Sequence, residues 1–325
     1  EPSRKLPLEV GPHGLDVPVG GPVRRDQAHL LDRTVVFRLV HLEGGKLELL
    51  HLVFFVPEVL RRVLGEVLDR FVDGLKGTLR SVEGVDCVFH EAALASVPRS
   101  VAAPLETHAA CVTGTLVLLD AARKAGVRRV VYAGSSSAYG SQTGATRGET
   151  DLPAPLSPYA AAKLAGEHYC HAFWATYGLE TVTLRYFNVF GPRQDPKSQY
   201  SAVIPLFVTA MLSGRSPTIF GDGRQSRDFT YVDNVVHGNL LAAAAPNVAG
   251  QMINVACGEE TDLLQLVTAI NRVLGTDIQP RFGPARPGDV RASRADISRA
   301  QNLLNYAPTI GFQDGLRRSI GYYKT

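Results

Sequence analysis

The sequence predicts an α/β fold with a doubly wound parallel sheet and a smaller α/β lobe toward the C-terminus. Three observations support this prediction: short apolar runs alternate with amphipathic segments, glycines end several of those segments, and polar residues follow the apolar runs. Strands that alternate with helices form βαβ units, whose strands are parallel and whose crossovers are right-handed. With 325 residues, 45% of them hydrophobic, the chain is long enough for two lobes.

The main sheet is predicted largely between residues 84 and 186. Its strands are short and apolar, as expected of strands buried on both faces, and are predicted at 85–90, 127–133, 180–186 and 252–256. Its amphipathic helices are predicted at 107–125 and 159–177. Gly126 ends the first helix. Ser157 caps the second, Pro158 takes its first position and Gly178 follows its last residue.

The smaller lobe is predicted from the rest of the C-terminal half. Helices that end before glycine or proline are predicted at 201–213, 232–244 and 262–274. Further helices near Leu303 and Arg317 are expected to close the chain. The lobe is expected to be discontinuous, because the run at 252–256 returns to the main sheet.

Tyr159 and Lys163 have the spacing of a proton-handling pair. Residues i and i+4 of a helix share one face, about 5–6 Å apart at Cβ, so both side chains are expected in one cleft. A phenol titrates near pH 10, and it needs nearby positive charge to act as a base at neutral pH. Ser135 is expected to orient the substrate oxygen. The Tyr-x-x-x-Lys spacing alone is a weak signal, so the surrounding elements carry the argument.

Three segments with polar residues lie at or just past the ends of predicted strands: His90 to Leu94, Gly134 to Ser137 and Phe187-Asn188. In parallel α/β sheets the ligand crevice lies beyond the carboxyl ends of the strands. We therefore expect these residues to meet at one edge of the sheet, where they form a ligand site.

Several further motifs accompany this arrangement. They are His90-Glu-Ala-Ala93, Ser135 before Tyr139-Gly140, Tyr159 with Lys163, Arg185-Tyr-Phe-Asn-Val-Phe-Gly-Pro192, Gly221-Asp-Gly-Arg-Gln-Ser-Arg-Asp-Phe229 and Arg286-Pro-Gly-Asp289. With these motifs, residues from about Gly84 to Tyr323 resemble extended short-chain dehydrogenases/reductases of the NAD-dependent nucleotide-sugar epimerase/dehydratase family. Within it they are most similar to UDP-N-acetylglucosamine and UDP-glucose 4-epimerases. The resemblance implies a Rossmann-like sheet, NAD as cofactor and a UDP-sugar as substrate.

The resemblance also implies roles for individual residues. It implies Tyr159 as the base, Lys163 as its electrostatic partner and ligand of the nicotinamide ribose, and Ser135 as the hydroxyl that binds the reacting sugar oxygen. The residues implied to contact NAD are His90, Ala92, Ala93, Leu94, Cys111, Ser135, Tyr159, Lys163 and Phe187. Those implied to contact the nucleotide sugar are Ser96, Val97, Ser136, Asn188, Arg227, Arg286, Asp289 and Ser293.

The resemblance assigns the substrate diphosphate to Asn188, Arg227 and Arg286, and the nucleoside ribose to Asp289. Guanidinium groups suit this role because they donate paired, charge-assisted hydrogen bonds to phosphate oxygens; surface solvation is the alternative interpretation of both arginines. The implied NAD domain comprises residues 84–186 and 229–257. The implied nucleotide-sugar lobe comprises residues 187–228 and 258–325.

The implied reaction is 4-epimerisation through a transient 4-keto sugar, in which Tyr159 removes the C4 hydroxyl proton while hydride leaves C4 for NAD. Dehydration is disfavoured, because Ser135-Ser136-Ser137 stands where dehydratases commonly carry Thr-Asp-Glu. Ser293 is small enough to leave room for an N-acetyl group. UDP-N-acetylglucosamine and UDP-N-acetylgalactosamine are therefore the favoured substrates, followed by UDP-glucose and UDP-galactose. A surface serine without a role is the alternative interpretation of Ser293.

Residues 1–83 depart from the family pattern. The family opens with a strand and a Gly-x-x-Gly-x-x-Gly loop, which cradles the NAD pyrophosphate at a helix N-terminus. Here Gly11 and Gly14 have the spacing, but Val17 occupies the third position. A helix with one apolar face is predicted from Pro57, and its apolar residues are Val59, Leu60, Val63, Leu64, Val67, Leu68, Phe71 and Val72.

Two interpretations of residues 1–83 compete. Either the reading frame or gene model is wrong before about Gly84, or the protein has lost its pyrophosphate loop. In the second case weak NAD binding and little or no epimerase activity are expected. Cys111 is a smaller departure, since the family usually has Asn there. The functional alternatives are a nucleotide-sugar decarboxylase or dehydratase and a nucleotide-sugar-binding protein without activity.

The composition is typical of a soluble cytoplasmic enzyme. A net charge of +3 does not indicate nucleic-acid or membrane binding, and the longest apolar run, at 52–56, is too short to span a bilayer. Four widely spaced cysteines are expected to be reduced, and the histidines lack metal-ligand spacing. The resemblance implies a homodimer formed through the helices at 107–125 and 159–177.

Overall fold

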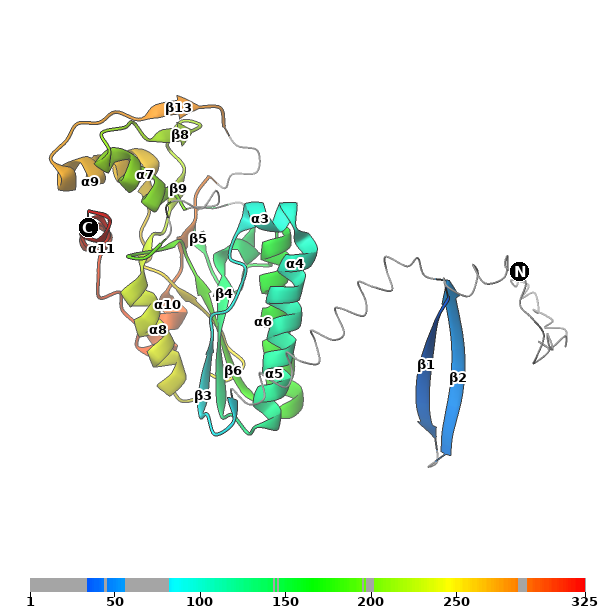
Figure 1. The fold of residues 1–325 in the computed structure, drawn as a ribbon. Helices are drawn as coiled ribbons and strands as arrows, with labels where there is room; N and C mark the ends of the chain where they lie inside the picture. The colour runs from blue at the N-terminus through cyan, green and yellow to red at the C-terminus, as the bar shows by residue number, and fades with distance from the viewer. Residues whose placement is uncertain are drawn as a thin grey trace, which may run out of the picture. The chain divides into compact units, whose positions relative to one another are not determined.

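The computed structural model describes residues 34–43, 46–55, 82–142, 144, 146–194, 196, 202–285 and 291–324. The chain divides into two compact units, residues 1–73 and 74–325. In the first unit, β1 (Thr34–Glu43) and β2 (Lys46–Phe55) form an antiparallel hairpin (Figure 1). We did not predict this hairpin, although its signal is present: Gly-Gly separates two runs rich in β-branched and aromatic residues. The helix predicted from Pro57 lies outside the described residues.

The second unit contains a four-stranded parallel sheet in the order β11-β6-β4-β3. Its strands are β3 (Cys87–His90), β4 (Arg129–Ser135), β6 (Glu180–Tyr186) and β11 (Met252–Val255). All but one residue of β4 are buried, as expected of a central strand covered on both faces. The predicted parallel α/β sheet is confirmed, with strand limits shifted by at most two residues.

Helices cover both faces of this sheet (Figure 1). On one face lie α3 (Val97–Ala102), α4 (Pro104–His108), the π-helical turn η1 (Ala109–Thr113), α5 (Gly114–Lys124) and α6 (Pro158–Tyr177). On the other lie α8 (Val232–Ala244) and α10 (Ser298–Leu304). The predicted first helix therefore consists of three joined segments. The predicted second helix is confirmed: Ser157 Oγ accepts from Ala160 N at 3.1 Å, and Gly178 follows with φ of 72°.

A second hydrophobic core is built by α7 (Val203–Leu212), α9 (Leu263–Leu274) and α11 (Phe312–Tyr323). The predicted helices of this region are confirmed to within two residues. Eight two- or three-residue strands lie outside the main sheet; they are β5 (Thr146–Arg147), β7 (Val189–Phe190), β8 (Thr218–Phe220), β9 (Ser226–Arg227), β10 (Thr230–Tyr231), β12 (Thr261–Asp262), β13 (Arg281–Gly283) and β14 (Arg294–Ala295). They form four pairs: β5 with β14, β7 with β10, β8 with β13 and β9 with β12. A 3₁₀ turn, η2 (Ser136–Tyr139), follows β4. Every helix in the described part of the chain is too short or too polar to cross a membrane.

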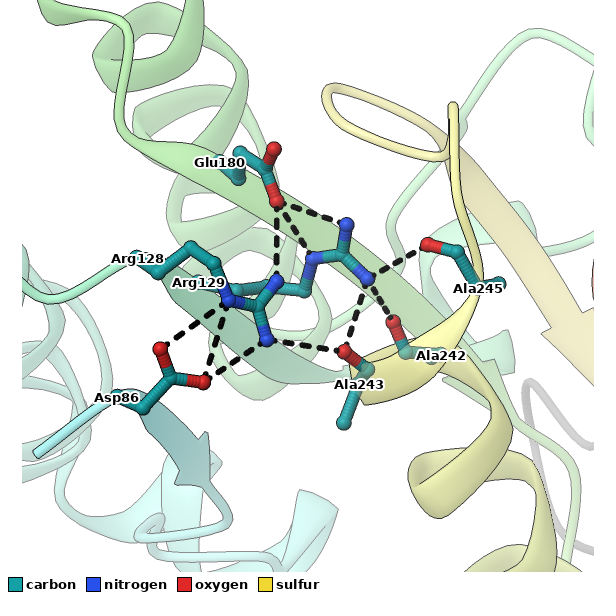
Figure 2. Close-up of polar contacts among 7 residues, drawn as sticks. All are labelled: Asp86, Arg128, Arg129, Glu180, Ala242, Ala243 and Ala245. Atoms are coloured by element: carbon teal, nitrogen blue, oxygen red, sulfur yellow. Dashed lines mark hydrogen bonds and ion pairs between the residues drawn. The ribbon is translucent and has the colours of Figure 1, made fainter.

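Arg129 ties α8 to the amino ends of the strands (Figure 2). Its guanidinium, only 4% exposed, donates to the carbonyls of Ala242, Ala243 and Ala245 at 2.8 to 2.9 Å. It also pairs with Glu180 at 2.7 Å. The last carbonyls of a helix lack hydrogen-bond donors within the helix. The guanidinium at this end donates to them, and its positive charge interacts favourably with the negative end of the helix dipole.

Candidate active site

The carboxyl end of β4 meets the first turns of α6. Ser135 is the last residue of β4, and its Oγ lies 2.8 Å from Ser137 Oγ and accepts from Ser137 N at 3.2 Å. The Ser135 hydroxyl acts to lower the pKa of the Tyr159 phenol, so these two residues, which are distant in the sequence, lie near each other. A substrate hydroxyl could bind between them.

Lys163 lies one helical turn further along α6 and is only 3% exposed. Its Nζ donates to the carbonyl of Ala133 at 2.8 Å and lies 5.0 Å from the centre of the Tyr132 ring. Burial lowers the pKa of Lys163 and raises that of Tyr159, which the hydrogen bond from Ser135 partly offsets. The pKa of Tyr159 is therefore raised overall, because the effect of burial outweighs that of the Ser135 hydroxyl.

His90 and Cys111 lie beside this pair. Burial lowers the pKa of His90 to about 4, so its ring is neutral near pH 7. Its Nε2 lies 2.9 Å from Thr115 Oγ1, whose hydroxyl donates to the carbonyl of Cys111 at 2.7 Å. Since that hydroxyl proton is used, we assign the imidazole proton to Nε2. Cys111 itself is buried in η1 and packs against Ala162 of α6.

Sequence analysis missed a buried ion pair beneath the site. Glu167, four residues after Lys163 on α6, binds Arg185 of β6 at 2.7 Å, and the two side chains are 5% and 1% exposed. Burial raises the pKa of Glu167, and Arg185 and the backbone of Ser135 act to lower it. A Cβ at Gly134 would lie 2.9 Å from Glu167 Oε1, so only glycine lets the carboxylate approach the strand this closely. The repeated four-residue spacing along α6 was the signal that could have revealed Glu167.

The other residues predicted to contact NAD follow strand ends. Phe187 comes directly after β6 and is fully buried, with its ring centre 6.0 Å from that of Tyr139. Ala92, Ala93 and Leu94 come after β3 and are half-buried or exposed.

A cavity of about 1080 Å³ opens between β7, α7 and β8. Of the residues predicted to bind the nucleotide sugar, Val97, Asn188 and Arg227 line it. Arg215 and Arg281, which sequence analysis did not single out, line it as well. The cavity is therefore rich in guanidinium groups, as an anionic ligand requires.

The remaining predicted substrate residues lie outside the lining. Ser96 caps α3 by accepting from Arg99 N at 3.2 Å. Ser136 begins η2, and Ser293 is half-buried just before β14. Arg286 and Asp289 lie outside the described residues.

A parallel sheet with a serine at the end of one strand and a Tyr-x-x-x-Lys helix beside it defines a short-chain dehydrogenase/reductase type of fold and site. Residues 57–256 match the model of the NAD dependent epimerase/dehydratase family. The chain belongs to this family, which confirms the resemblance found in the sequence.

Individual relatives are similar over most of the chain. UDP-glucose 4-epimerase of Mycolicibacterium smegmatis is 37% identical over 297 residues, which cover 91% of this chain and 92% of that protein. The structure resembles UDP-N-acetylglucosamine 4-epimerase from Methanobrevibacter ruminantium in complex with UDP-N-acetylmuramic acid, with a TM-score of 0.74 and 41% identity over 76% of this chain and 79% of that one. UDP-glucuronic acid 4-epimerase from Bacillus cereus, in complex with UDP-glucuronic acid and NAD, has a TM-score of 0.71 and 34% identity over 76% and 78% of the chains.

Proposed function

We propose that this protein is a UDP-sugar 4-epimerase that acts on UDP-N-acetylglucosamine and UDP-N-acetylgalactosamine, and also on UDP-glucose and UDP-galactose. The observation that carries the proposal is the placement of Ser135 at the end of β4 beside α6, the helix that holds Tyr159 and Lys163, in the same unit as an arginine-lined cavity. The relatives named as 4-epimerases support it. We assign nucleotide-sugar binding to 187–228 and 258–325.

The residues at the carboxyl ends of β3, β4 and β6 suit the nicotinamide end of NAD. Lys163 offers ammonium hydrogens for ribose hydroxyls, and the neutral ring of His90 lies near it. Phe187 directly follows β6 and is fully buried. When bound there, NAD would accept a hydride from the sugar and later return it. Residues 1–83 contain no Gly-x-x-Gly-x-x-Gly to hold the pyrophosphate. We therefore expect weak NAD binding by this chain, and a micromolar or tighter dissociation constant in titration calorimetry would contradict that expectation.

In the proposed reaction, Tyr159 takes the proton from the C4 hydroxyl while Ser135 holds the same oxygen by a hydrogen bond. Loss of hydrogen from C4 leaves a 4-keto sugar. If the ketone turns over beside Tyr159 and Ser135 before a hydride returns to C4, the configuration at C4 is inverted. Tyr159 then gives its proton back to the oxygen.

The substrate preference rests on three serines. Ser136 and Ser137 offer no carboxyl group to act as an acid near C5 and C6, which disfavours dehydration. Ser293, as a small side chain, leaves space for an N-acetyl group at C2. A homodimer formed through α5 and α6 remains a prediction, to be tested by light scattering in solution.

The decisive experiment is to incubate the full chain separately with UDP-N-acetylglucosamine, UDP-glucose and UDP-glucuronic acid, each with added NAD, and to separate the products by chromatography with mass detection. Epimerisation gives a product of unchanged mass with a new retention time. Loss of water or of carbon dioxide, the latter from UDP-glucuronic acid, would instead identify a dehydratase or decarboxylase. Binding of UDP-N-acetylglucosamine without any product would indicate a nucleotide-sugar-binding protein.

A further inference from the structure

Asp228 is a fully buried carboxyl group, with 0% exposure, beside the wall of the arginine-lined cavity. The proposed reaction gives it no role. Its Oδ1 accepts from the backbone N of Cys257 at 3.0 Å, and its Oδ2 accepts from Gly258 N at 2.9 Å and Ala295 N at 3.2 Å. A buried carboxylate is costly unless it is hydrogen-bonded, and these three donors supply the required partners.

The backbone of Asp228 makes two more links. Its N donates to the carbonyl of Ser293 at 2.9 Å, and its carbonyl accepts from Asn188 Nδ2 at 3.3 Å. One residue thereby joins the segment after β6, the turn after β11 and the segment that enters β14. These segments carry Asn188 and Ser293, two of the residues proposed to contact the nucleotide sugar.

Arg227 is the residue directly before Asp228 and the last residue of β9. Its side chain lines the cavity, and its Nη1 donates to the carbonyl of Ser226 at 2.8 Å. Because the two residues are adjacent in the chain, anchoring the carboxylate of Asp228 also limits the positions that the backbone of Arg227 can take.

We propose that Asp228 is the positioning residue of a nucleoside-diphosphate site: it does not touch the ligand, but it holds Arg227, Asn188 and the Ser293 segment in the geometry that binds the diphosphate. This inference rests on the proposed function in placing the nucleotide in this cavity. Preorganised donors bind an anion better than donors that must be ordered on binding, so loosening this anchor should weaken binding of the diphosphate most.

The test is titration calorimetry of UDP and of uridine with the full chain and three variants. Asp228→Asn keeps the size of the side chain but replaces one accepting oxygen with an NH₂ group that faces backbone N–H groups. Arg227→Met removes the proposed ligand contact itself. Val248→Ala shortens a fully buried side chain before β11 that does not line the cavity, so it serves as a destabilised control. Thermal unfolding of each variant shows that the titrations are run on folded protein.

We expect Asp228→Asn to weaken UDP binding by about tenfold, because backbone donors lose their acceptor, and to weaken uridine binding by much less. Val248→Ala should lower the unfolding temperature without changing either affinity. Unchanged UDP affinity in Asp228→Asn, an equal loss for UDP and uridine, or an equal loss in Val248→Ala would each overturn the inference. Absence of UDP binding by the parent chain would overturn it too. The proposed 4-epimerase function, unlike the role of Asp228, is contradicted if UDP binds as expected but no sugar isomer forms with added NAD.

Discussion

The proton-handling residues Tyr159 and Lys163 come from one helix, α6, whereas the cavity takes Asn188, Arg227 and Arg281 from three separated segments. In the first region, helical spacing sets which side chains share a face. In the second, short strands and a buried carboxylate hold loops together. The contrast shows that helical periodicity can bring residues together without long-range contacts, while a loop-built site depends on anchors far apart in the sequence.

The largest expected effect separates chemistry from binding. Tyr159→Phe removes the proposed base and should lower sugar interconversion by about a thousandfold, while UDP affinity stays the same. Interconversion is followed by chromatography with NAD at high concentration, and UDP binding by calorimetry. Tyr169→Phe, an exposed change on the same helix, is the matched control. Equal turnover of Tyr159→Phe and the parent would remove the proposed mechanism.

The second prediction tests whether α6 is stabilised at the candidate active site by a contact with β6 as well as by its own helical hydrogen bonds. Glu167→Ala leaves Arg185 buried without its carboxylate and should lower the free energy of unfolding by about 3–5 kcal/mol. Urea unfolding followed by circular dichroism measures the change. Asp120→Asn, which breaks partly exposed ion pairs with Arg123 and Lys124 on α5, should cost less than about 1 kcal/mol. If both variants lose a similar free energy of unfolding, the ion pair between Glu167 and Arg185 does not stabilise the candidate active site more than an exposed pair would.

The third prediction concerns acid sensitivity of the candidate active site. The pKa of His90 is lowered from 6.5 to about 4, so between these values the unfolded chain binds a proton that the folded chain does not. Stability is therefore full above pH 6.5 and falls as the pH drops toward 4. From pH 7 to pH 5, His90→Gln should lose about 2 kcal/mol less than the parent in urea unfolding. His108→Gln, at an exposed position, is the control, and an unchanged pH dependence in His90→Gln would contradict the prediction.

The smallest predicted effect concerns the cavity. Arg227→Lys keeps the charge but removes the planar fork of donors, so UDP binding should weaken by about tenfold with little change in stability. Calorimetry measures the affinity and thermal unfolding the stability. Arg224→Lys changes a neighbouring exposed arginine that does not line this cavity. If both variants bind UDP equally well, Arg227 does not contribute to UDP binding, and the proposed role of the cavity is contradicted.

Sequence patterns were sufficient for the elements whose signals are local. The helix α6 was predicted to within one residue, because Ser157, Pro158 and Gly178 mark its ends and hydrogen bonds within the helix connect residues close in sequence. The four parallel strands were predicted from short apolar runs. The hairpin of β1 and β2 was missed because its alternation is interrupted by long apolar stretches, such as 52–56, which mask the period of two.

The amino-acid sequence by itself determined the fold class, the family and the shared face of Tyr159 and Lys163, since these depend on periodicity and on residues within a few positions of each other. Only the tertiary structure decided that Glu167 meets Arg185, that Lys163 binds the carbonyl of Ala133, and that Asp228 joins three segments. These contacts link residues that are between 18 and 67 positions apart. They form because buried polar groups need hydrogen-bond partners inside the protein. The need for a partner can be anticipated from a buried charge, but its identity depends on how the chain is folded.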